Sequence, residues 1–152
     1  MSLAAACAFL ARKDYQFVAV TVDHGLQEGS AEVAARTQRA LTDLGLTATV
    51  ETAEVTATSD GLEADARTAR YAALDRAAKA HDTSGILLAH TQNDQAETVL
   101  LGLLRGSGAR SLAGMRPRTG PYIRPLLGIT RAETEAATTC LLYTSPSPRD
   151  GL

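Results

Sequence analysis

Cysteine is scarce in this sequence, and its scarcity excludes several kinds of site. Only Cys7 and Cys140 occur among 152 residues, and they form no CxxC pair. A disulfide framework and a zinc or iron–sulfur site are therefore not indicated, and we expect no metal ligands among the site residues. Cys7 falls on the apolar face of a predicted first helix, where we expect it to pack in the core.

Long apolar runs are missing as well. No stretch approaches the roughly 18 apolar residues that a membrane-spanning helix needs, and no basic segment precedes a hydrophobic one near the start. We expect a cytoplasmic protein without membrane contact. Because 45% of the residues are hydrophobic and only 4% are aromatic, the composition fits one α/β domain with an interior rich in Ala, Leu and Val.

Acidic residues are absent from one internal segment. Residues 1–97 contain 14 acidic and eight basic side chains, whereas residues 98–132 contain no acid and six arginines: Arg105, Arg110, Arg116, Arg118, Arg124 and Arg131. A one-sided arginine block is the electrostatic pattern expected for phosphate or nucleic-acid contact. The alternative is a solvated loop whose compensating acids lie elsewhere in the fold.

The order of predicted elements indicates a nucleotide-binding architecture. Helices are expected at 2–12, Ser30–Leu44, Gly61–Ala80, Asp94–Arg105 and from Arg131, and strands at Phe17–Val22, Ala48–Val55 and Ile86–Ala89. Ser30 and Thr130 are expected to cap helices, and Gly45 to end one. Alternating strands and helices predict an α/β fold, a Rossmann-like parallel sheet with flanking helices whose ligands bind at the carboxyl ends of strands.

The segment after the strand Ile86–Ala89 carries the richest chemistry, HTQNDQAETVLLGLLRGSG. Asp94 and Glu97 are three residues apart and share one face of a helix. Two neighbouring carboxylates need a cationic partner, for which an ammonium group or Mg²⁺ would suit. Alternatively, Asn93 or Asp94 caps the helix while Glu97 supports its first turn. Capping alone would leave three polar side chains unexplained, those of His90, Gln95 and Arg105.

This segment resembles the signature of tRNA(Ile)-lysidine synthetases, which are PP-loop ATP pyrophosphatases. Further blocks of the family appear in the same order and cover most of residues 16–135. They are VDHGLQEGSAEVA (Val22–Ala34), GLEADARTARYAAL (Gly61–Leu74), SLAGM (Ser111–Met115) and YIRPLLGITRAE (Tyr122–Glu133).

The resemblance implies a concrete reaction. The family uses ATP and Mg²⁺ to adenylate C2 of the wobble cytidine (position 34) of tRNA(Ile) with a CAU anticodon. The ε-amine of L-lysine then attacks, AMP leaves, and lysidine forms. The enzyme is a ligase that forms a C–N bond, and a homodimer is one expected assembly.

The resemblance also assigns roles to residues. Asp94, Glu97 and Arg105 would be catalytic, and Asp94, Glu97 and His90 would bind lysine. ATP binding falls to Ser2, Asp23, His24 and Arg70, and tRNA or phosphate contact to Arg70, Arg110 and Arg124. Structural alternatives stand beside two of these assignments. His24 could cap a turn with Gly25, and the helix that carries Arg70 could present only a Glu63–Arg67 surface ion pair.

Both ends of the chain depart from the family pattern. The family's glycine-rich SGGxDS loop is not matched, because Ser2 aligns with its last serine and Met1 stands where its aspartate would be. We therefore expect a truncated, inactive fragment that lacks the first strand and the phosphate-holding loop. Residues Cys140–Asp150, CLLYTSPSPRD, resemble a translated sequencing adapter, although a Ser/Pro-rich linker is an alternative. The expected division is a partial PP-loop domain at 1–139 and a non-native tail at 140–152.

Other functions remain open at this point. A PP-loop enzyme that thiolates tRNA would share the ATP chemistry, but such enzymes commonly carry paired cysteines. An amidating or NAD-forming PP-loop ligase would lack the DQAET and RGSG segments and the arginine block. An alternative from a different functional class is a remnant that binds a nucleotide but does not catalyse a reaction.

Overall fold

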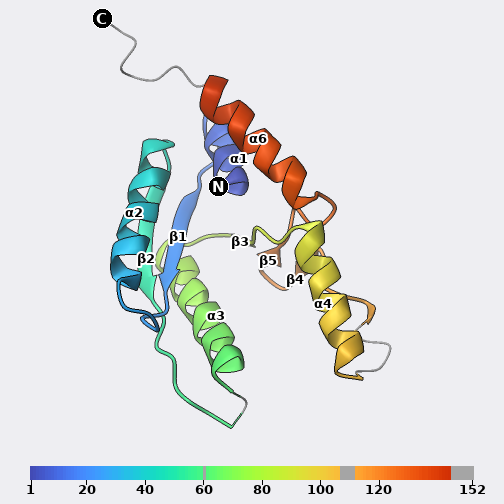
Figure 1. Ribbon diagram of the computed structural model, residues 1–152. Helices are drawn as coiled ribbons and strands as arrows, with labels where there is room; N and C mark the ends of the chain where they lie inside the picture. The colour runs from blue at the N-terminus through green and yellow to red at the C-terminus, as the bar shows by residue number, and fades with distance from the viewer. Residues whose placement is uncertain (60, 107–111, 145–152) are drawn as a thin grey trace, which may run out of the picture. The chain divides into compact units, whose positions relative to one another are not determined.

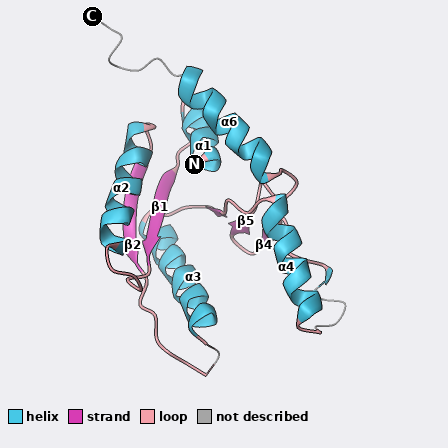
Figure 2. Ribbon diagram, viewed as in Figure 1, coloured by secondary structure: helices cyan, strands magenta, loops and turns pink. Residues whose placement is uncertain are grey.

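A computed structural model describes residues 1–59, 61–106 and 112–144, and the chain divides into two compact units (Figure 1). The first unit comprises Ala6–Ser84, and the second comprises Met1–Ala5 together with the chain from Gly85 onward. Helices and strands follow one another along the chain much as the sequence predicts (Figure 2).

The first unit is built on a parallel pair of strands. Its elements are the end of α1 (Ser2–Ala11), β1 (Val18–Asp23), α2 (Ser30–Asp43), β2 (Thr47–Thr52) and α3 (Leu62–Ala80). In the register of the strands, Val18 lies opposite Thr47 and Asp23 opposite Thr52. Helices α2 and α3 both pack on this pair. The predicted strand–helix–strand arrangement is confirmed, with each boundary within a few residues of its expected place.

Small side chains form the core of the first unit. Ala69, Ala73 and Ala77 recur every fourth residue, so that α3 presents one smooth face, and all three are buried. Leu41 and Cys7 are also buried. Burial raises the pKa of the Cys7 thiol, because the thiolate is disfavoured away from water. The prediction that Cys7 packs in the core is confirmed.

The two ends of α2 show one confirmed and one wrong prediction. Gly45 ends the helix as expected, with φ of 87°, and the N–H groups of Gly45 and Leu46 donate to helix carbonyls. Ser30 is not the N-cap. That position is taken by Gly29, whose φ of 81° turns the chain into the helix without any side-chain cap. The Ser30 hydroxyl instead bonds to Asp23.

The second unit contains a small mixed sheet. Its elements are β3 (Ile86–Leu87), α4 (Gln92–Leu104), β4 (Arg118–Thr119), β5 (Tyr122–Ile123) and α6 (Arg131–Thr144). Strand β5 pairs in parallel with β3 and antiparallel with β4. The described strands therefore form two sheets instead of the single one expected. The β4–β5 hairpin was not predicted, because two-residue strands show no alternation of apolar and polar residues.

Helix α4 leaves its apolar residues largely in solvent. None of its residues is buried, and Leu104 is 83% exposed. Thr130 caps α6 as predicted, and α6 runs from Arg131 to Thr144. Residues 145–152 of the expected tail lie outside the described residues. No helix in the described part of the chain is long and apolar enough to cross a membrane.

Candidate functional site

A pocket lies at the carboxyl end of β1, in the first unit. It has a volume of about 410 Å³ and is lined by the end of the strand, by the following loop and by the first turns of α2, with Ala66 from α3. Pockets of this size commonly hold small molecules, and the carboxyl end of a parallel strand is the usual ligand edge of an α/β fold. The predicted residues Asp23 and His24 both line it.

Asp23 shapes the loop that forms this pocket. Its Oδ1 accepts a hydrogen bond from the Gly25 N–H at 2.9 Å, which closes a tight turn. This bond and the Ser30 hydroxyl lower the pKa of Asp23, because both favour the ionised carboxylate. Gly25 is thus held by Asp23, which argues against the alternative that His24 makes this turn.

His24 offers a free polar atom beside the pocket. Its Nδ1 is buried and has no hydrogen-bond partner among the described residues. Buried polar atoms without a partner are uncommon and cost free energy, so such an atom marks a place where a ligand group could be satisfied. The pocket therefore fits a ligand with hydrogen-bonding groups, which a nucleotide has.

The start of α4 is fixed by a capping box between Thr91 and Asp94. Asp94 Oδ2 accepts hydrogen bonds from the Thr91 N–H at 2.6 Å and from the Thr91 hydroxyl at 2.8 Å. The helix therefore begins at Gln92, two residues before its predicted start, and neither Asn93 nor Asp94 is the N-cap. Asp94 serves as the third helical residue of the box.

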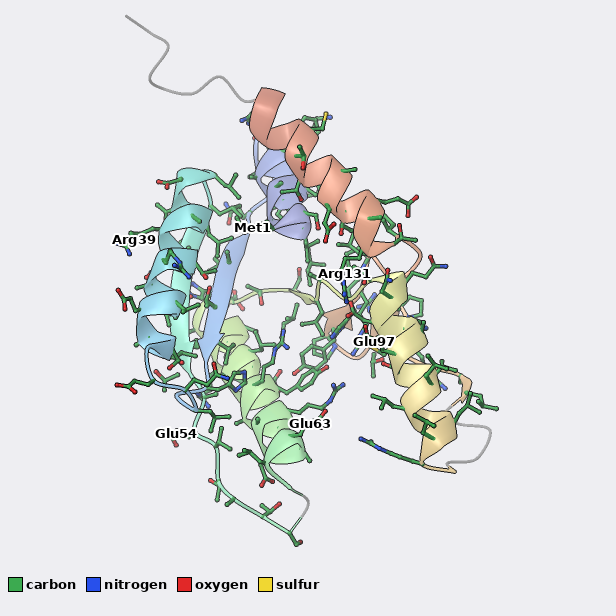
Figure 3. The ribbon with its side chains drawn as sticks, viewed as in Figure 1. Met1, Arg39, Glu54, Glu63, Glu97 and Arg131 are labelled. Atoms are coloured by element: carbon green, nitrogen blue, oxygen red, sulfur yellow. The ribbon has the colours of Figure 1, made fainter. Side chains whose placement is uncertain are left out.

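The second carboxylate oxygen of Asp94 faces an arginine from a distant segment. Arg131 Nη2 lies 3.4 Å from Asp94 Oδ1 and 3.6 Å from Glu97 Oε1, and Figure 3 shows Glu97 and Arg131 close together. The cationic partner that this carboxylate pair was expected to need is thus supplied within the chain. The Thr91 N–H lowers the pKa of Asp94 most, and Arg131 and His90 lower it further.

Four side chains therefore gather near the start of α4, and we call His90, Asp94, Glu97 and Arg131 the carboxylate cluster. His90 is half-buried, whereas the Glu97 and Arg131 side chains are 64% and 53% exposed. The cluster combines two anions with one cation at a surface that solvent and ligands can reach. Sequence reasoning found the first three members and missed the role of Arg131, because no local pattern links residues 37 apart.

The predicted arginines do not all join this cluster. Arg105 caps the far end of α4, about 16 Å along the helix axis from Asp94 at 1.5 Å per residue. Arg124 is buried, and its Nη1 donates to the Arg116 carbonyl at 3.1 Å. Arg70 is exposed on α3 in the first unit, Ser2 is the first residue of α1, and Arg110 lies outside the described residues.

Residues with metal-binding side chains stay dispersed in the part of the chain that the structure describes. No three His, Cys, Asp or Glu side chains gather there as they would around a metal ion. A magnesium ion commonly takes only one or two carboxylates and completes its shell with water and substrate phosphates. We therefore assign no protein ligand to Mg²⁺.

Comparison with known families decides the class. The model of the PP-loop domain matches residues 1–141. The chain belongs to the PP-loop family. This family uses ATP. The U34-tRNA thiolase NcsA from Methanococcus maripaludis has the same fold, with a TM-score of 0.69 over 97% of this chain and 57% of that one, at 17% identity.

The PP-loop chain has close relatives among tRNA(Ile)-lysidine synthases. It is 51% identical to that of Thermobifida fusca over 90% of this chain and 43% of the relative. It is 54% identical to that of Leifsonia xyli over 90% of this chain and 41% of the relative. The chain thus spans about two fifths of the length of these relatives.

Proposed function

We propose that this PP-loop chain is the ATP-using domain of a tRNA(Ile)-lysidine synthase. The reaction would join L-lysine to C2 of cytidine 34 in tRNA(Ile) with a CAU anticodon, through an adenylated cytidine. The carboxylate cluster is the observation that carries the proposal, because it offers two carboxylates for an amine substrate on a chain half identical to such enzymes.

The cluster suits an amine nucleophile. Asp94 keeps its charge well below neutral pH, since its pKa is lowered, so it can hold an ammonium group. Glu97 extends from the same helix face and His90 lies beside Asp94. Holding lysine by these groups would orient its ε-amine and lower the entropic cost of bringing the amine to the adenylated carbon.

The pocket beside β1 is the proposed ATP site. ATP would supply the adenylyl group that activates the cytidine, with Mg²⁺ offsetting phosphate charge. Asp23 fixes the loop through Gly25, and His24 Nδ1 provides a polar contact for the nucleotide. Arg70, exposed on α3, remains a proposed tRNA or phosphate contact, whereas Arg124 is buried and donates to the Arg116 carbonyl.

Two kinds of measurement test this proposal. Incorporation of labelled lysine into a tRNA(Ile) transcript with a CAU anticodon, by an intact homologue that carries the SGGxDS loop, tests the reaction, with a UAU transcript as control. Calorimetric titration of L-lysine and ATP tests the division of sites. We expect Glu97→Gln to weaken lysine binding about tenfold, or about 1.4 kcal/mol, and to leave ATP binding unchanged.

Glu97→Gln is the sharper variant, because Asp94 also holds the start of α4. Glu54→Gln, at an exposed position of the first unit, is the matched control and should change neither affinity. Equal losses of lysine and ATP binding in Glu97→Gln would contradict the separation of the two sites. Sulfur transfer to a U34 transcript without lysine incorporation would favour a thiolase instead.

A further inference from the structure

Arg131 is positioned by its backbone and leaves its head group accessible. Its N–H donates to Asn93 Oδ1 at 2.8 Å, and the neighbouring Thr130 forms a capping box with Glu133. The carbonyl of Ile129 accepts the Gln92 N–H at 2.9 Å. These bonds tie the starts of α4 and α6 together. The side chain is nevertheless 53% exposed, so its guanidinium can turn toward a ligand without moving the helix.

The contacts of Arg131 with the two carboxylates are weak. Both run through Nη2, at 3.4 and 3.6 Å, beyond the usual range of a charge-assisted hydrogen bond. Exposed ion pairs of this kind shift an equilibrium constant by at most about fivefold. A ligand carboxylate that engages the guanidinium with two parallel hydrogen bonds would compete easily.

The charges of the carboxylate cluster match an amino acid better than a simple amine. Asp94 and Glu97 carry two negative charges, and Arg131 one positive charge a few ångströms away. The start of α6, whose first residue is Arg131, adds partial positive charge there. A zwitterion has both an ammonium and a carboxylate group, so it can satisfy both halves at once.

We propose that Arg131 receives the α-carboxylate of the amino-acid substrate, while Asp94 and Glu97 receive an ammonium group. Arg131 would then be the residue that makes the site specific for an amino acid over a diamine. This inference rests on the proposed function, since it takes lysine as the ligand. It adds a carboxylate-binding group to the three residues assigned to lysine.

The test compares L-lysine with 1,5-diaminopentane, which lacks only the carboxylate. Both are titrated calorimetrically into the full chain, into Arg131→Gln and into Arg131→Lys, with Arg39→Gln on α2 as the control. We expect the unmodified chain to bind lysine at least tenfold more tightly than the diamine. Arg131→Gln should weaken lysine binding about tenfold and leave diamine binding equal or stronger, while Arg131→Lys should keep part of the preference.

Each other outcome has a distinct meaning. If Arg131→Gln weakens both ligands equally, or leaves lysine binding unchanged, Arg131 is only a counter-ion and the inference is wrong. If the unmodified chain binds neither ligand, the proposed lysine site itself fails. Circular dichroism of each variant separates loss of binding from loss of folding, and Arg131→Lys supplies the comparison if Arg131→Gln does not fold.

Discussion

The Gln95 side chain forms hydrogen bonds with both backbone polar groups of Met115. Its Nε2 donates to the Met115 carbonyl at 2.9 Å, and its Oε1 accepts the Met115 N–H at 2.7 Å. The neighbouring Gly114 has φ of 61°, and a Cβ there would lie 2.7 Å from Gln95 Oε1. This clamp joins α4 to the segment that begins at Leu112 and accounts for a side chain that capping alone left unexplained.

Replacing Gly114 tests this clamp. Gly114→Ala should lower the free energy of unfolding by about 2–4 kcal/mol, because it adds a left-handed alanine and displaces the Gln95 amide. Gly120→Ala is the matched control, since Gly120 has φ of 58° but nothing within 4 Å of its added Cβ. It should cost only about 1–2 kcal/mol. Urea unfolding measures both, and equal costs would show that the clamp contributes nothing.

Capping boxes define the two helices that meet at the carboxylate cluster. Thr91 with Asp94 begins α4, and Thr130 with Glu133 begins α6. The cap at Thr130 was predicted from the sequence, but its partner Glu133 was not. The start of α4 was predicted two residues late, because Asn93 and Asp94 are themselves good capping residues and only the hydrogen bonds choose among them.

Removing the Thr91 hydroxyl should destabilise the protein. Thr91 is 7% exposed, and Thr91→Ala removes its bond to Asp94 and the cap of the helix. We expect a loss of about 1–2 kcal/mol in the free energy of unfolding. Thr98→Ala on the same helix, where the hydroxyl only donates to the Asp94 carbonyl, should stay within about 0.5 kcal/mol. A Thr98→Ala loss as large as that of Thr91→Ala would argue against the box.

Across the whole molecule, several carboxylates are stabilised in their ionised form by local hydrogen bonds. The pKa is lowered at Asp23, Asp65, Asp94 and Glu133. At Asp65 the Thr58 hydroxyl is the main cause and the Thr58 N–H the second. Since each folded pKa lies below its unfolded value, these groups stabilise the fold above about pH 4 and lose that contribution as the pH falls through the folded pKa values.

The free energy of unfolding should therefore be flat from pH 7 to about pH 5 and fall at lower pH. Asp65→Asn should make the fall less steep, because the amide does not titrate. Asp43→Asn, at an exposed position near the end of α2, serves as the charge-matched control. Urea unfolding at a series of pH values measures the slopes, and parallel curves for the unmodified chain and Asp65→Asn would contradict the role of the Thr58 bonds.

Features that depend on residues close together in the chain could be predicted from the sequence. Periodicity, Gly45 and Thr130 fixed most helices and two helix ends, and the run from Phe17 placed β1. The spacing of Asp94 and Glu97 put both carboxylates on one helix face. These features follow from hydrogen bonds and geometry within a turn or two of chain, which a local pattern records.

The tertiary structure alone decided which distant groups meet. It brought Arg131 to Asp94 and Glu97, and it buried Arg124 against the Arg116 carbonyl. It also divided the strands into two sheets and left the leucines of α4 in solvent. Such pairings depend on how helices and strands pack against one another. Packing is stabilised by many contacts between segments far apart in the chain, and no local sequence pattern records which segments will meet.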